Sequence, residues 1–279
     1  MRNSMDQYTT VNGCSIRYRE AGKGPLLFLV HGIAGFLEEW NSVVEILSEY
    51  YRVIALDLPG HGLSDKPEIS YTINQLSGFL RDFIISFSSG KIYLAGHSLG
   101  GAICLNLVIQ TPNLVERLVL VNSVFEKIPF SIRLGTFRFI PRLVKKVPQW
   151  MVESSSRKSI HKKELITSEL NDRAYQYINT PGNLEAMFSI MQSNINLSGL
   201  DINYLSQYKE GMKDINIPVL ILYGDQDKII PDINSKLLHR YLSNSECISV
   251  KNCGHGLHYE SYEAFCKEVL TFFKIHLSP

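Results

Sequence analysis

One short segment of the chain combines a serine hydroxyl with closely spaced glycines. Ser98 lies in the hexapeptide Gly-His-Ser-Leu-Gly-Gly, residues 96–101. An apolar run typical of a buried strand precedes it, and a segment typical of a helix follows it. A serine held on a sharp turn between strand and helix could act as a nucleophile, whereas the same glycines could also open an ordinary helix. The rest of the chain decides between these two interpretations.

A serine hydroxyl becomes an effective nucleophile only beside a base, and the base needs an acid that orients it. Asp225 and Asp227 follow one apolar run, and His255 follows the next. Serine, aspartate and histidine therefore occur in the chain order that nucleophile-elbow enzymes use. Because all of them follow predicted strands, we expect them at the carboxyl edge of one open sheet. His258, three residues beyond His255, is an alternative base.

The segments around these residues alternate between strand and helix patterns. The Asn12-Gly13 pair predicts a tight hairpin near the start of the chain. Continuous apolar runs predict buried strands, and apolar residues at helical spacing predict the helices between them. The predicted strands cover residues 26–30, 52–56, 91–95, 118–121, 219–223 and 247–250. The predicted helices cover residues 38–50, 73–87, 99–110, 233–242 and 262–276.

This alternation predicts an α/β fold, with a mostly parallel sheet of about eight strands and helices on both faces. The alternation stops near residue 124 and resumes after residue 213. The segment between holds no convincing strand, and its helical patterns are interrupted by prolines at positions 129, 141, 148 and 181. We therefore predict a core domain, residues 1–123 and 214–279, and a helical lid domain, residues 124–213, inserted after the sixth strand.

The bulk composition excludes several other classes of protein. The chain has 279 residues and a net charge of +1, so it lacks the overall basic field of a nucleic-acid-binding protein. Its five cysteines include no C-x-x-C pair, which argues against a disulfide framework or a zinc site and favours a reducing compartment. We expect Cys104 and Cys253 to be buried small residues. The polar N-terminus lacks the apolar core of a signal peptide, and no apolar run is long enough to span a membrane. We expect a cytoplasmic protein without a metal or other cofactor.

Five motifs, in this order, resemble those of the α/β-hydrolase superfamily in its lid-bearing branch. They are HGIAG (31–35), DLPGHGLSD (57–65), GHSLGG (96–101), GDQD (224–227) and GH (254–255). The resemblance covers nearly the whole chain outside the predicted lid. It implies a serine hydrolase in which Ser98 is the nucleophile, His255 is the base and Asp227 is the acid.

The resemblance distinguishes between the two aspartates of the GDQD motif. The acid of the family lies three residues after the glycine of this motif, which implies Asp227 and leaves Asp225 as a turn or capping residue. Some relatives place the acid after the sixth strand instead. That position is occupied here by Asn122 and Ser123, which carry no carboxylate.

The resemblance also implies which backbone groups stabilise a developing oxyanion. HGIAG resembles the oxyanion loop of the family, which implies that the N–H groups of Ile33 and Leu99 are the donors. We expect three other histidines to be structural. They are His31 before this loop, His61 in the PGHG turn and His97 beside the serine.

A serine at this position favours acyl transfer to water, because the relatives that open epoxides or remove halide carry an aspartate there. A carboxylic ester with a hydrophobic acyl group ranks first as substrate, followed by a thioester; a monoacylglycerol-type lipase is a further alternative. Carbon–carbon hydrolases of the superfamily also use serine. They rank lower, because their usual asparagine before the serine and small-residue-rich oxyanion loop are absent. There are two alternatives without catalysis: a small-molecule receptor on the same fold, and a scaffold that only binds partners.

The predicted lid combines basic and aromatic residues, concentrated between residues 124 and 163. In the simplest interpretation its apolar face covers the site and its charges face water. A basic, aromatic surface could also bind an anionic membrane, or an acidic carrier protein that delivers the acyl group. In each case the apolar residues indicate a hydrophobic acyl substrate.

Overall fold

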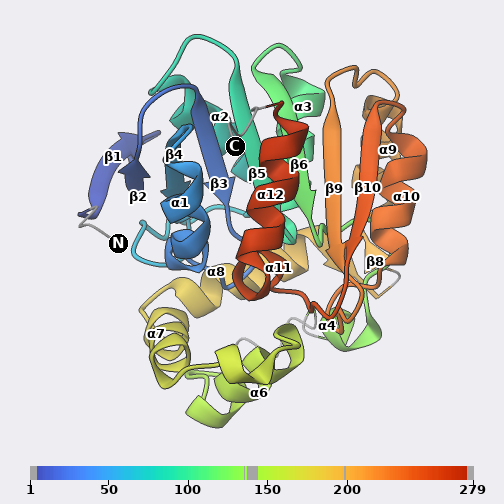
Figure 1. Ribbon diagram of the computed structural model, residues 1–279. Coiled ribbons are helices and arrows are strands. Elements are labelled where there is room, and N and C mark those ends of the chain that lie inside the picture. Colours follow the sequence, from blue (N-terminus) through green and yellow to red (C-terminus); the bar gives the residue numbers. More distant parts are fainter. Residues whose placement is uncertain (1–4, 135, 137–143, 198, 275–279) are drawn as a thin grey trace.

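Eight strands hydrogen-bond into one sheet in the order β1-β2-β4-β3-β5-β6-β9-β10 (Figure 1). The structure, a computed structural model, describes residues 5–134, 136, 144–197 and 199–274. The strands β1 and β2 form a hairpin around Asn12-Gly13, and β2 pairs antiparallel with β4, whereas the other neighbours are parallel. The strands span Gln7–Val11 (β1), Cys14–Ala21 (β2), Leu26–Val30 (β3), Arg52–Leu56 (β4), Ile92–His97 (β5), Val115–Val121 (β6), Val219–Gly224 (β9) and Ser245–Val250 (β10).

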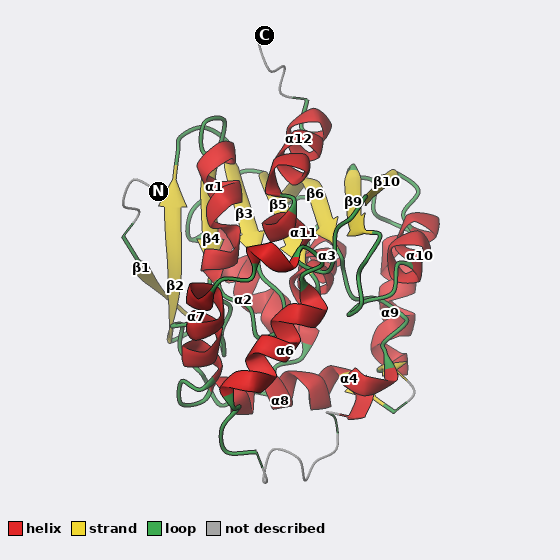
Figure 2. Cartoon of the chain, turned by 60° about the horizontal axis from the view of Figure 1, so that its bottom comes forward, coloured by secondary structure: helices red, strands yellow, loops and turns green. Residues whose placement is uncertain are grey.

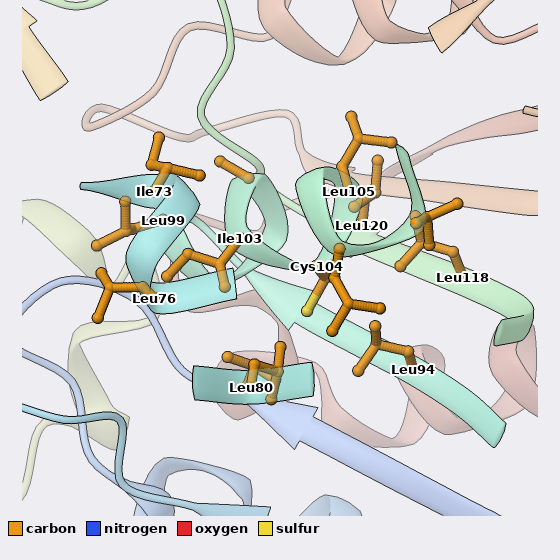
Figure 3. Packing of buried hydrophobic residues seen from close by; sticks show 14 of the residues in the cluster. Ile73, Leu76, Leu80, Leu94, Leu99, Ile103, Cys104, Leu105, Leu118 and Leu120 are labelled. Carbon is orange, nitrogen blue, oxygen red and sulfur yellow. The ribbon is translucent and has the colours of Figure 1, made fainter. Parts of the chain in front are cut away.

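Side chains of the central strands alternate between two apolar layers, because successive residues of a strand point to opposite faces. One layer packs beneath helices α1 (Asn41–Leu47) and α12 (Tyr262–Phe272). The other packs beneath α2 (Ile73–Ile85), α3 (Leu99–Gln110), α9 (Ile202–Met212) and α10 (Ile233–Tyr241). Figure 3 shows part of this second layer, where Leu76 and Leu80 of α2 face Ile103 of α3 and Leu94 of β5. The predicted α/β fold with a mostly parallel, eight-stranded sheet is confirmed.

Several element boundaries differ from the prediction for local reasons. The helix predicted over residues 38–50 begins as a 3-10 turn, η1 (Leu37–Trp40), before α1. The carboxylate of Asp57 accepts the backbone N–H of Leu37, which holds this turn against β4. The last helix ends at Phe272 and Lys274 adopts a positive φ of 59°, while residues 275 and 276 of the predicted helix lie outside the described residues.

We call residues 122–218, between β6 and β9, the insertion; the residues of this range that the structure describes are mainly helical. Its elements are α4 (Phe130–Leu134), α6 (Gln149–Ser159), η2 (Lys163–Leu165), α7 (Ser168–Ile178), α8 (Asn183–Asn194), β7 (Ile195–Asn196), β8 (Gly199–Leu200) and α9. The short β7–β8 hairpin was not expected from the sequence. Helices α6, α7 and α8 lie beyond the ends toward which the parallel strands point (Figures 1 and 2).

Helix α9 is different, because it packs on the core. The hydroxyl of Tyr208 donates to the carbonyl of Ala102 in α3, and Gly211 lies against Ile109 of the same helix. The division into a core domain and a lid domain, residues 124–213, stays a prediction. Within the described residues, none of the helices is long and apolar enough to cross a lipid bilayer.

Candidate active site

Ser98 occupies a strained turn between β5 and α3. Its backbone φ of 54° and ψ of −117° lie outside the regions that residues with a Cβ normally adopt. The surrounding backbone holds the turn in place, because the Ser98 N–H donates to the carbonyl of Val121 at 2.9 Å. The Ser98 carbonyl accepts N–H groups of Gly101 at 3.1 Å and Val124 at 3.2 Å. Strain that is held by several hydrogen bonds is typical of functional positions rather than of ordinary helix starts.

The glycines on either side of Ser98 allow the close approach of strand and helix. A Cβ on Gly96 would lie 2.5 Å from the carbonyl oxygen of Gly100, on the first turn of α3. A Cβ on Gly100 would lie 2.3 Å from the carbonyl oxygen of His31, just beyond β3. Both distances are impossible for real atoms, so any larger residue would displace the serine turn from the neighbouring backbone.

Asp227 and His255, which follow β9 and β10, form a hydrogen-bonded pair. The Nδ1–H of His255 donates to Asp227 Oδ2 at 2.8 Å, which leaves Nε2 as the nitrogen that can accept a proton. Both side chains are almost fully buried. The other oxygen of Asp227 accepts the backbone N–H groups of Ile229 at 2.7 Å and Ile230 at 2.9 Å. These three contacts fix the orientation of the histidine ring relative to the sheet.

Asn122 adds a contact to this pair that the sequence did not predict. Its Nδ2 donates to Asp227 Oδ2 at 2.6 Å from the residue that directly follows β6. Burial acts to raise the pKa of Asp227, but the neighbouring His255 and the N–H groups of Ile229 and Ile230 outweigh it, so the pKa is lowered. Asp227 is therefore a carboxylate at neutral pH.

Asp225 lies apart from this pair, at the start of the loop after β9. Its backbone N–H donates to the carbonyl of Val250, and its carboxylate accepts the N–H of Cys253 at 3.5 Å. Both contacts join it to the segment that carries His255. Cys253 is fully buried, and burial raises the pKa of its thiol to about 12. Cys104 is equally buried, so the expectation for these two cysteines is confirmed.

The other buried histidines stabilise loops around the serine. The Nδ1–H of His31 donates to the carbonyl of Gly32 at 2.7 Å, and Nε2 accepts the N–H of Leu58 at 3.0 Å. The ring of His61 packs against that of His31 at 4.9 Å between ring centroids, tilted by 59°. The Nε2–H of His97 donates to the backbone carbonyl of His255 at 2.9 Å, so its ring links the serine turn to the histidine loop.

His258, the alternative base, lies in the separate short helix α11 (Leu257–Glu260) rather than at the start of the last helix. Its ring packs against Trp40 at 4.1 Å and against His97 at 4.4 Å between ring centroids, tilted to both. Its nearest carboxylate is Glu39, 3.8 Å from Nε2, whereas the contact to Asp227 is made by His255. This arrangement favours His255 as the base.

The loop after β3 packs directly against the serine. A Cβ on Gly32 would lie 2.9 Å from the Cβ of Ser98, and Gly35 closes a turn by donating to the carbonyl of Gly32 at 3.1 Å. Within the described residues, the backbone N–H groups of Ile33 and Leu99 donate no hydrogen bond to the protein. Both groups are therefore free to donate to an oxygen atom of a substrate.

Glu260 joins the histidine loop to the insertion, a link that sequence patterns did not indicate. Its buried carboxylate accepts the N–H of Gly254 at 2.9 Å through Oε1, and those of His161 at 2.7 Å and Lys162 at 3.0 Å through Oε2. The N–H of His255 donates to the carbonyl of Ser159 at 2.7 Å. The end of α6 and the segment after it are therefore fixed to the loop that carries His255.

A second link joins the insertion to the other side of the site. The guanidinium of Arg17, only 1% exposed, donates to Glu38 at 2.6 Å and to Asp57 at 3.0 Å. The hydroxyl of Tyr177, in α7, donates to the same Glu38 at 3.1 Å. Burial raises the pKa of Asp57 to about 6, although Arg17 acts to lower it. This buried network joins η1, which follows the HGIAG motif, to Asp57 of the DLPGHGLSD motif.

An open, mostly parallel sheet with a strained serine turn and a buried Asp–His pair at its carboxyl edge defines a class of hydrolase folds. The family model described as the alpha/beta hydrolase fold matches residues 25–262, and the chain belongs to this family.

Known proteins similar to the chain include several hydrolases. The chain is 27% identical to 2-hydroxy-6-oxo-6-(2'-aminophenyl)hexa-2,4-dienoic acid hydrolase of Metapseudomonas resinovorans, over 96% of this chain and 90% of that one. It is 29% identical to the hydrolase YugF of Bacillus subtilis, over 95% and 96% of the two chains. The solved structure of a serine hydrolase involved in carbazole degradation matches with a TM-score of 0.82 and 26% identity, over 98% and 99% of the two chains.

Proposed function

We propose that this hydrolase cleaves a carboxylic ester, or a thioester, of a hydrophobic acyl group through an acyl-serine intermediate. The observation that carries the proposal is the 2.8 Å hydrogen bond between His255 and Asp227 at the sheet edge where the strained Ser98 turn lies. A buried carboxylate that accepts the Nδ1–H of a histidine orients the ring and leaves Nε2 able to act as a base. Ser98, His255 and Asp227 are the proposed nucleophile, base and acid.

In the proposed acylation step, His255 Nε2 takes the proton of the Ser98 hydroxyl while the serine oxygen bonds to the carbonyl carbon of the substrate. The carbonyl oxygen gains negative charge and accepts hydrogen bonds from the backbone N–H groups of Ile33 and Leu99. Within the described residues, these two groups have no other partner. Collapse of this intermediate breaks the bond to the leaving group, and the imidazolium gives that group its proton. Asp227 stabilises the imidazolium by its charge.

Deacylation repeats these steps with water as the nucleophile. His255 takes a proton from water, the resulting hydroxide attacks the acyl carbon, and Ser98 leaves with the proton returned by the histidine. The products are a carboxylic acid and free enzyme. A lowered pKa at Asp227 supports this cycle, because the carboxylate stays charged while His255 gains and loses its proton.

The substrate class rests on the insertion. Its described residues include exposed apolar side chains, Phe130 (61% exposed), Trp150 (68%) and Met151 (45%), beside basic side chains such as Lys145, Lys146 and Arg157. Such a surface suits an acyl chain presented by an acidic carrier protein or an anionic membrane. Salt weakens attraction between exposed charges. Activity on a carrier-bound or vesicle-bound ester should therefore fall with ionic strength, whereas activity on a small neutral ester should not.

The test is a panel of p-nitrophenyl esters from acetate to laurate, together with labelling by a fluorophosphonate probe. We expect turnover, with a preference for the longer acyl chains, and labelling at Ser98 that the Ser98→Ala variant loses. Absence of both turnover and labelling in the folded wild-type protein would refute the proposal.

Carbon–carbon bond hydrolysis is a second candidate, favoured by the similarity to the Metapseudomonas resinovorans enzyme. The chain carries His97 before the serine, where carbon–carbon hydrolases usually carry asparagine, and this places the candidate second. A 2-hydroxy-6-oxo-hexadienoate substrate separates the two. If this substrate is turned over faster than the esters, carbon–carbon bond hydrolysis becomes the first candidate.

A further inference from the structure

Three side chains beside the proposed active site lie close together but form no hydrogen bonds with one another. One nitrogen or oxygen atom each from Glu39, His97 and His258 lie within 4.8 Å of one another. We call these residues the Glu39 cluster. They come from η1, β5 and α11, so the cluster lies where the loop after β3, the serine turn and the histidine loop meet. His97 and His258 are 7% and 1% exposed.

The histidine nitrogens of this cluster are buried and without partners in the described part of the chain. His97 donates its Nε2–H to the carbonyl of His255, which leaves a lone pair on Nδ1, and Nδ1 makes no hydrogen bond. Neither ring nitrogen of His258 makes one. Buried polar atoms in folded proteins nearly always have a partner, and an ion is one of the partners that accounts for exceptions. One nitrogen from each of these histidines, together with the Glu39 carboxylate, could bind a single ion placed between them.

We propose that the Glu39 cluster binds a divalent transition metal ion of the zinc type. Two imidazoles and one carboxylate are a common ligand set for zinc. A ligating histidine usually donates its second N–H to a carbonyl or carboxylate, as His97 does to His255. His258 Nε2 lies 3.8 Å from Glu39 Oε2, close to the separation of about 3.3 Å between two ligands of one tetrahedral zinc ion.

The glycines of the loop after β3 lie close to two of the proposed ligand atoms. A Cβ on Gly32 would lie 3.2 Å from His97 Nδ1, and one on Gly35 would lie 3.0 Å from Glu39 Oε2. A larger residue at either position would crowd one of these two atoms.

The proposed ion is structural. It would connect three segments that also carry the proposed nucleophile, base and oxyanion donors, without contacting the substrate. This site differs from the sequence-based expectation of no metal, which relied on cysteine spacing. Glu39 and His258 are far apart in the chain, so no local sequence motif indicates that they form a site. The proposal is independent of the proposed ester hydrolysis.

The test uses tag-free, full-length protein stripped with a chelator and titrated with Co²⁺, whose visible absorption reports protein ligation. We expect one Co²⁺ per chain, displaced by Zn²⁺. The Glu39→Gln and His258→Gln variants should each bind at least about tenfold more weakly. His239→Gln, which changes an exposed histidine in α10, should bind as wild type.

Thermal unfolding keeps the test decisive if a histidine variant folds poorly. Zn²⁺ should raise the unfolding temperature of the wild type and of His239→Gln, but not of Glu39→Gln, because a ligand stabilises only the state that binds it. Glu39 is partly exposed, so its replacement should leave the fold intact. Absence of a Co²⁺ absorption change in the wild type, or equal binding by Glu39→Gln, would overturn the proposal and leave buried water as the partner of these atoms.

Discussion

The loops at the carboxyl ends of the strands and the insertion beyond them are held in different ways. Ser98 and Asp227 are fixed by backbone hydrogen bonds from residues nearby in the chain or on neighbouring strands. Helices α6 and α7 of the insertion are joined to the core mainly by side chains, chiefly Glu260 and the partly buried Tyr177, together with the backbone bond from His255 to Ser159. The contrast suggests two tasks for testing: the backbone of the core would hold the proposed catalytic residues in place, and side-chain links would position the insertion.

The largest effect should come from the core. In the Ser98→Ala variant we expect hydrolysis of a p-nitrophenyl ester to fall by about a million-fold in kcat, because no other group can form the acyl intermediate. The fold should be retained, since alanine keeps the backbone contacts of Ser98. Steady-state kinetics with active-site titration measures the loss. A variant that keeps a tenth of the wild-type rate would show that the reaction uses another nucleophile.

The two aspartates of the GDQD motif provide a matched pair. Asp227→Asn should lower kcat by about ten-thousand-fold, because the amide cannot stabilise the imidazolium and favours the wrong tautomer of His255. Asp225→Asn should keep the rate within about threefold, because Asp225 contacts only the backbone of the histidine loop and Lys251. Comparable losses in the two variants would contradict the assignment of the acid.

Glu260→Gln tests the link between the two regions. A glutamine offers one acceptor oxygen where the carboxylate accepts three N–H groups, so the histidine loop and the segment after α6 should separate. We expect kcat to fall by about 10- to 100-fold with little change in KM, as when a base is displaced by a fraction of an ångström. Glu263→Gln, at an exposed position in α12, is the control. A loss confined to thermal stability would mean that Glu260 does not position His255.

A smaller effect is expected at Tyr177, in the second link. Tyr177→Phe removes a hydrogen bond to the buried Glu38 and should lower the free energy of unfolding by about 1 kcal/mol. Its effect on activity should appear in KM, because α7 belongs to the insertion. Tyr175→Phe is the control, since the Tyr175 hydroxyl makes no hydrogen bond within the described residues. Urea denaturation of both variants makes the comparison, and equal stability would show that this link contributes nothing.

The smallest effect is a pH dependence of stability. The pKa of Asp227 is lower in the folded chain than in the unfolded chain, so the folded state binds fewer protons. The stabilisation is complete above the unfolded pKa of about 4 and is lost as the pH falls through the folded value. Asp227→Asn should therefore lose less stability than the wild type on acidification. Parallel urea titrations at neutral and acid pH measure this difference, and identical slopes would argue against it.

The local patterns of the core predicted its elements well. The strand over residues 52–56 and the helix over residues 99–110 have the predicted bounds, because apolar runs and a following proline carry the signal within a few residues. The position of the serine between such elements was predictable for the same reason. Boundaries that depend on tertiary contacts were less accurate. The 3-10 turn at Leu37–Trp40 depends on a carboxylate 20 residues away.

The links between distant segments could not be predicted from one sequence. Asn122 and Asp227 are 105 residues apart, and Glu260 and His161 are 99 residues apart, so no local spacing records their contact. Asn122 was recognised only as a position without a carboxylate. In the insertion, basic and aromatic residues indicated a helical surface, but their pattern did not indicate which side chains join it to the core.

The burial of Cys253 makes the opening of the histidine loop measurable. A thiol with a pKa of about 12 and no exposed surface reacts with an alkylating reagent only when its surroundings open. Cys253 lies two residues before His255, whereas Cys104 lies in the centre of α3 and becomes accessible on unfolding of the core. In a variant that lacks Cys14, Cys247 and Cys266, the alkylation rates of the two remaining thiols could be measured separately. One would record the lifetime of the closed histidine loop, and the other the lifetime of the fold.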